Sequence, residues 1–455
     1  MSVDVHPVSH QDDTAAPATE PKPGPVGRIV AGSLLAGGVA ALVLSLAVFA
    51  GATESVITGS LLTGFGFGWA MIAVLTSRYT TRPQRWAFAP AAFMGVTGVA
   101  LVVFAPGYGA MTRLSWVWPP VVAAMSVWMF VQVRRSATRA GRRLLIPVVA
   151  VLGLASVGAT YENIAEQRDQ DAYPATGATY QVNGHRMHLD CHGAGGPTVV
   201  LFNGTGETSA TWARIAGPIG ETTRVCAFDR PGQGWSEETT RPQDGVTAAK
   251  DLSTLLAGAG ETGPFVLVGH STGGTYAMTY AHRYPQQVAG MVLLDSSSPY
   301  QLTKVAAYPA QYAVMRRGLA LLPTLARLGV SRLAPAPDLP APAGAQVQAL
   351  TSTAKSARNG RDEISVAPRV FAQARALTTL GSRPLAVLTT SESLKGAGWS
   401  DAQDQLAGLS TDSVHRTVDS THAGLVVDQA PAAAAVRAVH EVLAAARTGS
   451  PMEPQ

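Results

Sequence analysis

Five apolar stretches in the first third of the chain constrain its fold more than any other feature. None of them contains a charged residue, and they cover residues 29–51, 56–76, 86–105, 114–133 and 144–161. Each is long enough to cross a hydrocarbon core of about 30 Å as a helix, and a cleaved signal peptide would account for only one of them. We therefore predict about five transmembrane helices within residues 28–161. The alternative is a set of buried core helices in a soluble domain.

Arginines in the connecting loops predict the orientation of this region. The loops at residues 77–85 and 134–143 carry three and five arginines, whereas the other two loops hold only Glu54 and Arg113. Because positively charged loops stay in the cytoplasm, residues 1–27 are expected inside and everything after the fifth span outside. Residues 1–27 are rich in Pro, Ala, Asp and Thr and are predicted to be a disordered cytoplasmic tail.

Charge and composition argue against two classes of function. The net charge is only +4, and no basic stripe with interleaved aromatic residues occurs, so we expect no nucleic-acid partner. No ionisable side chain lies inside a span, so nothing marks a path for protons or ions. The spans are therefore expected to anchor the protein in a membrane.

From about residue 178 the chain alternates short β-rich runs with helical segments rich in Ala and Leu, separated by Gly/Pro turns. This alternation is typical of an α/β fold with a mainly parallel sheet. Asn183-Gly184 lies between two such runs and is a strong hairpin signal, so the sheet is expected to open with an antiparallel pair. A last helix is predicted over residues 432–446.

The run Phe265–Gly274 reads Phe-Val-Leu-Val-Gly-His-Ser-Thr-Gly-Gly. Its first four residues favour a buried strand, and a helix is expected from Gly273. Between them, Gly269-His270-Ser271-Thr272-Gly273 fits the G-x-S-x-G nucleophile elbow, in which small residues permit a strained strand-to-helix turn. Such a turn exposes the Ser271 hydroxyl above the end of the sheet, next to the N–H groups of the helix N-terminus.

Four further segments occur in a recognisable order around this elbow. They are Asn203-Gly204-Thr205-Gly206, the turn Asp229-Arg230-Pro231-Gly232-Gln233-Gly234-Trp235-Ser236, the strand end Leu294-Asp295, and a late Thr421-His422 ahead of the last helix. With these segments, residues 178–447 resemble the α/β-hydrolase fold family. The resemblance implies a mainly parallel sheet with a cap insertion over residues 299–380. We predict a linker over residues 162–177 before this domain and a tail over residues 448–455 after it. Serine at the elbow separates the chain from the dehalogenase and epoxide-hydrolase branches, which carry aspartate there.

The resemblance also implies a catalytic triad. Ser271 is the expected nucleophile, and His422 is the expected base because it follows the last strand. The acid stays open between Asp295, at the end of the strand after the elbow, and Glu392, after the strand at residues 385–389. The oxyanion donors are expected to be the backbone N–H groups of Thr205 and Thr272. No proton-transfer role is assigned to His270.

Cys191 and Cys226 are the only cysteines. In the strand order of the family, the second and fourth strands are neighbours, which implies a Cys191–Cys226 disulfide in an oxidising compartment; two buried free thiols are the alternative. His185, His188 and His192 lie near Cys191, but residues three apart on a strand point to opposite faces. We therefore expect no metal site, and no cofactor.

The cap insertion is rich in Ala, Leu and Arg, with a helix expected over residues 312–332 and a Pro-rich link over 334–343. The resemblance implies that it covers Ser271 and lines a hydrophobic pocket. The expected function is that of a multi-pass membrane serine hydrolase facing outward, which cleaves a small-molecule or lipid-like ester, or an amide, through an acyl-enzyme. An acyltransferase with the same triad and a non-catalytic hydrolase-like membrane protein are the alternatives.

Overall fold

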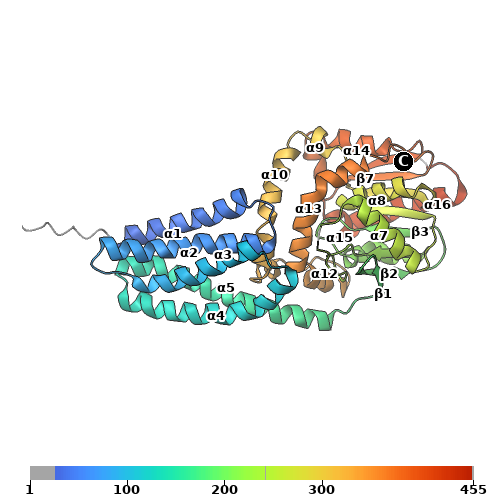
Figure 1. Ribbon diagram of the computed structural model, residues 1–455. Helices are drawn as coiled ribbons and strands as arrows, with labels where there is room; N and C mark the ends of the chain where they lie inside the picture. The colour runs from blue at the N-terminus through green and yellow to red at the C-terminus, as the bar shows by residue number, and fades with distance from the viewer. Residues whose placement is uncertain (1–25, 241, 453–455) are drawn as a thin grey trace, which may run out of the picture.

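Two parts make up the protein: a bundle of long helices and a sheet domain that sits across one end of it (Figure 1). The computed structural model describes residues 26–240 and 242–452. The predicted tail at residues 1–27 therefore lies almost wholly outside the described residues.

The bundle contains the five predicted apolar helices, and each is long and apolar enough to cross a membrane. Its elements are α1 (Val26–Val43), the π-helical turn η1 (Leu44–Val48), α2 (Glu54–Tyr79), the short η2 (Arg85–Ala87), α3 (Phe88–Phe104), α4 (Tyr108–Ser136) and α5 (Arg139–Ala172). Glycines let these helices approach closely, as is typical of membrane bundles. A Cβ on Gly37 would lie 2.8 Å from the Cα of Gly68, and one on Gly59 would lie 2.6 Å from the carbonyl oxygen of Gly98.

Helix α5 is longer than expected. We predicted that the fifth span ends at residue 161 and that a linker follows over 162–177, but the helix continues to Ala172. Its extension is polar, and two of its acidic side chains, Glu162 and Asp169, pair with Arg332 of the cap. Arg332 thus gives two acidic side chains of this polar segment a partner in the folded protein.

The sheet has eight strands in the order β1-β2-β4-β3-β5-β6-β7-β8. They are β1 (Ala178–Val182), β2 (His185–His192), β3 (Thr198–Phe202), β4 (Val225–Phe228), β5 (Phe265–His270), β6 (Val288–Leu294), β7 (Leu385–Thr390) and β8 (Ser413–Val418). As predicted, Asn183-Gly184 joins an antiparallel pair, and both residues have positive φ (45° and 95°). The six strands β3 to β8 run parallel to one another, so their carboxyl ends meet at one edge of the sheet.

Helices cover both faces of the sheet, which gives the domain two apolar cores. One face packs against α7 (Gly245–Gly258), α8 (Thr272–Arg283) and α14 (Trp399–Ala407), and the other against α6 (Ala213–Gly220), α15 (Gly424–Val427) and α16 (Gln429–Thr448). Short turns of helix complete the domain: η3 (Ser209–Trp212), η4 (Pro285–Gln287) and η6 (Ser393–Lys395). This is the α/β fold with helices on both faces that the alternation of the sequence predicted.

The cap is helical, but its first helix is not continuous as predicted. Residues 308–333 form α10 (Tyr308–Leu319), α11 (Leu322–Ala326) and the short η5 (Val330–Leu333). Pro323 lies in the first turn of α11, where proline is tolerated, and Gly329 takes a left-handed conformation (φ 74°) just before η5. The rest of the cap comprises α9 (Gln301–Lys304), α12 (Ala343–Thr351) and the long α13 (Ala354–Ala374).

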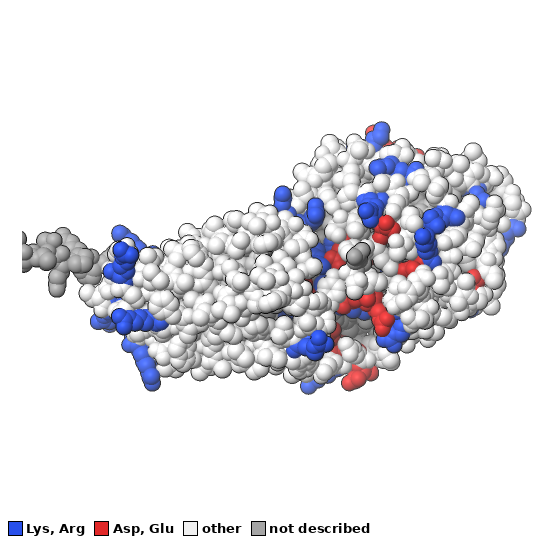
Figure 2. All heavy atoms as spheres, viewed as in Figure 1, with Lys and Arg blue, Asp and Glu red and all other residues white. Residues whose placement is uncertain are grey.

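Buried ion pairs join the cap to the bundle. Glu54, at the start of α2, contacts the guanidinium groups of both Arg327 and Arg358, the latter at 2.8 Å. Arg332 contacts Glu162 and lies 2.7 Å from Asp169. Figure 2 shows that charged side chains gather at this junction and at the far end of the bundle, with an almost uncharged surface between them.

Candidate active site

Ser271 occupies a strained turn between β5 and α8. Its backbone has φ 55° and ψ −128°, a conformation that L residues rarely adopt. The turn is so tight that a Cβ on Gly273 would collide with the carbonyl oxygen of Phe202, and one on Gly269 would lie 2.5 Å from the Cα of Gly274. Glycine is therefore required on both sides, as the G-x-S-x-G pattern predicted.

Asp295 lies at the end of β6, fully buried, with its carboxylate beside the His422 ring. His422 Nδ1–H donates to Asp295 Oδ2 at 2.5 Å, Ser393 Oγ donates to the same oxygen at 2.6 Å, and Thr390 donates through its N–H and its hydroxyl, each at 3.1 Å. Burial opposes ionisation of Asp295, but these hydrogen bonds outweigh it and hold the pKa of Asp295 below its usual value. The group is a carboxylate that fixes the orientation of the imidazole.

Glu392 also reaches His422, but not its ring. Its Oε2 accepts a hydrogen bond from the backbone N–H of His422 at 2.7 Å. Both candidate acids thus contact the same histidine, with Asp295 holding the side chain and Glu392 holding the loop.

Among the described residues no hydrogen bond joins the Ser271 hydroxyl to the His422 ring. The ring instead packs against that of His270, with centroids 4.7 Å apart, and its side chain is 41% exposed. Catalytic hydrogen bonds often tighten only when substrate binds, so this geometry is compatible with a base that is completed by substrate.

The predicted oxyanion turn passes directly beside Ser271. A Cβ on Gly204 would lie 2.9 Å from Ser271 Cβ. The hydroxyls of Thr205 and Thr272 are 3.0 Å apart, so the two residues expected to supply backbone donors lie side by side. Thr272 is the first residue of α8, where helix N–H groups lack partners within the helix.

A second carboxylate and imidazole lie next to this site, and the sequence reasoning did not assign them. The Glu207 carboxylate accepts hydrogen bonds from the backbone N–H of Gly204 and from His270 Nδ1. His270 Nε2 lies 3.1 Å from the carbonyl oxygen of His422. This chain of contacts connects the oxyanion turn, the elbow and the loop that carries His422. The acidic Glu207, only three residues after Gly204, was the feature of the sequence that could have indicated this pair.

Hydrogen-bond geometry defines the charge of this pair. A carboxylate and a carbonyl oxygen only accept, so both ring nitrogens of His270 must donate, and the ring is an imidazolium. Burial opposes this charge, but Glu207 outweighs burial and raises the pKa of His270. Burial likewise opposes the charge of Glu207, and the contacts with His270 and Gly204 lower the pKa of Glu207. The two groups form a buried ion pair.

The cap closes the back of the oxyanion turn. Arg230 donates to the carbonyl oxygen of Asn203 at 2.6 Å and to Glu363 of α13 at 2.8 Å, and its guanidinium lies 4.2 Å from the centroid of the Tyr276 ring. Burial raises the pKa of Glu363, although Arg230 opposes the shift. A cavity of about 30 Å³ lies on the far side of this pair, lined by Arg230, Glu363, Tyr276 and residues at the bundle end such as Tyr108.

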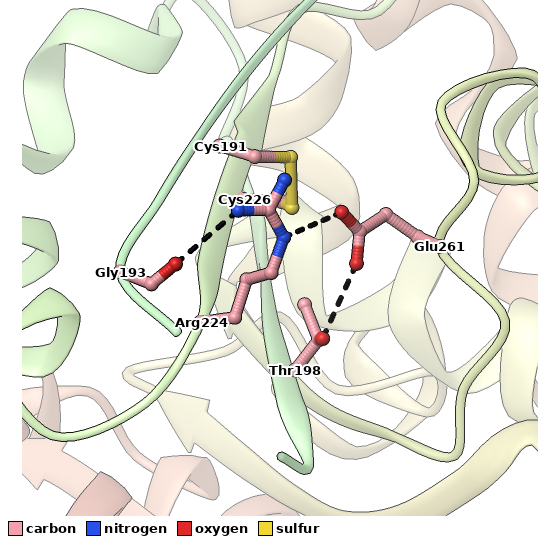
Figure 3. The surroundings of a disulfide bond; sticks show 6 residues. All are labelled: Cys191, Gly193, Thr198, Arg224, Cys226 and Glu261. Atoms are coloured by element: carbon pink, nitrogen blue, oxygen red, sulfur yellow. Dashed lines mark hydrogen bonds and ion pairs between the residues drawn. A yellow bond between two sulfur atoms is a disulfide. The ribbon is translucent and has the colours of Figure 1, made fainter. Parts of the chain in front are cut away.

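The predicted disulfide between Cys191 and Cys226 is present, and the two residues are direct partners on the adjacent strands β2 and β4. Figure 3 shows Arg224 beside it, with Nε 2.6 Å from Glu261 and Nη1 donating to the carbonyl oxygen of Gly193. Cys191, Cys226 and Glu261 offer ligand atoms within 4.8 Å of one another, but disulfide sulfurs are not thiolate ligands.

The three histidines near Cys191 do not converge. His185 lies 3.3 Å from Asp251, His188 lies 2.9 Å from Asp229, and His192 Nε2 lies 3.1 Å from the carbonyl oxygen of Ala216. Each ring is used by a separate structural contact.

Comparisons with known proteins agree with this architecture. A family model described as "alpha/beta hydrolase fold" matches residues 197–329. Among solved structures, haloalkane dehalogenase DbeA from Bradyrhizobium elkani is similar with a TM-score of 0.50 and 19% identity, over 60% of this chain and 99% of that one. At this level of identity the likeness shows the fold alone.

Curated relatives match shorter segments. Lipase LipV of Mycobacterium tuberculosis is 39% identical over 113 residues, which are 24% of this chain and 41% of the lipase. The uncharacterized protein YbdG of Bacillus subtilis is 24% identical over 161 residues, 35% of this chain and 50% of that protein. The chain thus spans half or less of the length of these curated relatives.

Proposed function

Because the second half of this chain has the α/β-hydrolase fold, we propose that the protein is a membrane-anchored serine hydrolase that cleaves an ester through an acyl-enzyme. Ser271 is the nucleophile, His422 the general base, and Asp295 the acid that orients it. The contact between Asp295 Oδ2 and His422 Nδ1, on loops that follow β6 and β8, is the observation that carries the proposal.

This contact supports a specific order of proton transfers in the proposed reaction. With Nδ1–H donating to Asp295, the Nε2 of neutral His422 is unprotonated and acts as the base. It accepts the Ser271 proton as Oγ attacks the carbonyl carbon, and the backbone N–H groups of Thr205 and Thr272 stabilise the oxyanion. The imidazolium then gives this proton to the leaving alkoxide, and the acyl group stays on Ser271. In the second half-reaction His422 takes a proton from water as the water oxygen attacks the acyl carbon. The bond between that carbon and Ser271 Oγ then breaks, the imidazolium returns the proton to Oγ, and the carboxylic acid leaves.

The bundle supports membrane anchoring. Its five helices carry exposed apolar side chains along their length, and charged side chains are confined to the two ends (Figure 2). The arginine-rich loops lie at the end away from the sheet domain, which favours an extracytoplasmic position for the hydrolase domain. A disulfide in that domain supports the same orientation, since disulfides persist in oxidising compartments.

Labelling with a fluorophosphonate probe tests the proposal. The full chain in detergent should be labelled, Ser271→Ala should lose the label, and Ser413→Ala, an exposed serine on β8, should keep it. A folded protein that is not labelled would contradict the proposed nucleophile. A panel of esters graded by acyl length would then define the substrate class.

A further inference from the structure

In the described part of the sheet domain, the large apolar side chains that are exposed all lie on one stretch of the cap. Among the described residues that follow α5, the large apolar side chains that are exposed are Val314, Leu322, Leu325, Val330 and Leu333. Val314 is 71% exposed and Leu333 is 83% exposed. All five lie on the consecutive elements α10, α11 and η5.

This stretch lies at the end of the membrane bundle. The hydroxyls of Thr324 and Thr58 of α2 are 2.8 Å apart, and Arg327 pairs with Glu54 at the start of the same helix. Gly329 packs so closely on α5 that a Cβ there would lie 3.0 Å from the carbonyl oxygen of Gly158. The cap residues 308–333 therefore lie beside the start of α2 and beside α5 at Gly158.

The bundle exposes apolar side chains up to this level. Phe104 at the end of α3 is 78% exposed, and Val157 and Tyr161 of α5 are also exposed. The apolar side chains of the cap thus continue the lipid-facing belt of the bundle. We therefore expect the partner of this cap surface to be the lipid of the adjacent leaflet.

Basic side chains accompany the apolar ones, as in helices that lie in a membrane interface. Arg316 and Arg317 of α10 are exposed, and neither has an ion-pair partner among the described residues. Arg316 also lines a cavity of about 160 Å³ between the cap and the loop that joins α1 to α2. The mixture of exposed apolar and unpaired basic groups suits the boundary between acyl chains and anionic headgroups.

We propose that the cap surface of residues 308–333 rests in the headgroup–acyl boundary of the leaflet next to the hydrolase domain, and that the enzyme takes a lipid ester from that leaflet. The choice of substrate rests on the proposed hydrolase function, whereas the position of the cap does not. The cap also contacts the candidate active site. Glu363 of its helix α13 accepts a hydrogen bond from Arg230, and Arg230 donates to the carbonyl oxygen of Asn203 in the oxyanion turn.

Spin labels test the position of the cap. Cysteine is introduced at Val314, at Leu333 and, as a control, at the exposed Ala444 of α16. Helix α16 lies on the side of the domain away from the bundle (Figure 1). The native cysteines are joined in a disulfide, so only the new thiol reacts. In full-length protein in phosphatidylcholine–phosphatidylglycerol nanodiscs, labels at 314 and 333 should be reached by oxygen rather than by a water-soluble nickel chelate, and the label at 444 the reverse.

Two outcomes of the labelling would overturn the proposal. Labels at 314 and 333 that the nickel chelate reaches as easily as the label at 444 would place the cap in water. Labels that neither reagent reaches would show that protein, such as a second copy of the chain, covers the surface.

Kinetics test the choice of substrate. For the double variant Val314→Asp with Leu333→Asp, the rate on a fluorogenic ester embedded in the bilayer, divided by the rate on a water-soluble ester, should fall by about tenfold or more. Ala444→Asp should keep the ratio of the unaltered protein, and an unchanged ratio in the double variant would overturn the substrate class. If the unaltered protein hydrolyses neither ester, the proposed hydrolase function is rejected, and the position of the cap is still decided by the spin labels.

Discussion

The carboxylate of Asp295 lies 2.5 Å from Nδ1 of His422, whereas the carboxylate of Glu392 reaches only the backbone N–H of that histidine, at 2.7 Å. One acid therefore sets the tautomer and orientation of the ring, and the other stabilises the loop around it. Each acid follows a strand of the parallel sheet, so the sequence did not distinguish them. They differ in which atom of His422 they contact.

Replacement of these two acids should have very different effects. Asp295→Asn should lower kcat/KM on an ester substrate by about 10³–10⁴-fold, because an amide does not stabilise the productive tautomer or the imidazolium. Glu392→Gln should lower it by less than about tenfold, since a neutral side-chain oxygen still accepts from the His422 N–H. Steady-state kinetics on folded variants provide the measurement. An effect of Glu392→Gln as large as that of Asp295→Asn would show that the acids were assigned wrongly.

The Glu207–His270 pair should make stability depend on pH. The pKa of His270 is raised above its usual value of 6.5, so its contribution to stability is fully present below that pH and is lost as the pH rises through the folded-state pKa. The melting temperature, measured by circular dichroism, should decrease as the pH is raised above 6.5. Glu207→Gln should flatten this slope, because the neutral amide no longer raises the pKa of His270.

The matched control for this pair is Glu221→Gln, an exposed glutamate, which should keep the slope. Part of the slope persists in Glu207→Gln, because Asp229 similarly outweighs burial and raises the pKa of His188. A Glu207→Gln slope equal to that of the unaltered protein would contradict the charge assigned to His270.

Loss of the Cys191–Cys226 disulfide should destabilise the hydrolase domain. It closes a loop with a sequence separation of 35 residues, and removal of such a link costs about 2–4 kcal/mol of unfolding free energy. The double variant Cys191→Ala with Cys226→Ala should unfold at lower urea concentration, and dithiothreitol should not shift its midpoint further. Unaltered protein that unfolds identically with and without reductant would argue against the bond.

Glu54→Gln should release the cap from the bundle. Glu54 is 1% exposed in its side chain and Arg358 is 3% exposed, so the variant leaves a buried guanidinium without that carboxylate, at a cost of about 3–5 kcal/mol. Hydrogen exchange of α11 and α13 should accelerate. Glu237→Gln is the control, because it breaks the exposed Arg186–Glu237 pair, which contributes only about 0–1 kcal/mol. Equal exchange in the two variants would mean that the Glu54 contacts do not hold the cap.

Local patterns in the sequence were sufficient for much of this protein. Apolar stretches without charge predicted the five bundle helices, and Asn183-Gly184 predicted the first hairpin, because each feature depends on residues close together in the chain. The elbow at Ser271 was predicted for the same reason, since glycine spacing alone determines whether that turn is possible.

Tertiary structure decided what depends on packing between distant segments. Local spacing left Asp295 and Glu392 equivalent, and only the arrangement of β6, β7 and the His422 loop brought one of them to the ring. The ion pairs of Glu54 with Arg327 and Arg358 join positions about 300 residues apart, and the extension of α5 pairs with Arg332 of the cap. A charge that looks solvated in the sequence becomes a structural contact only when the folded chain places its partner beside it.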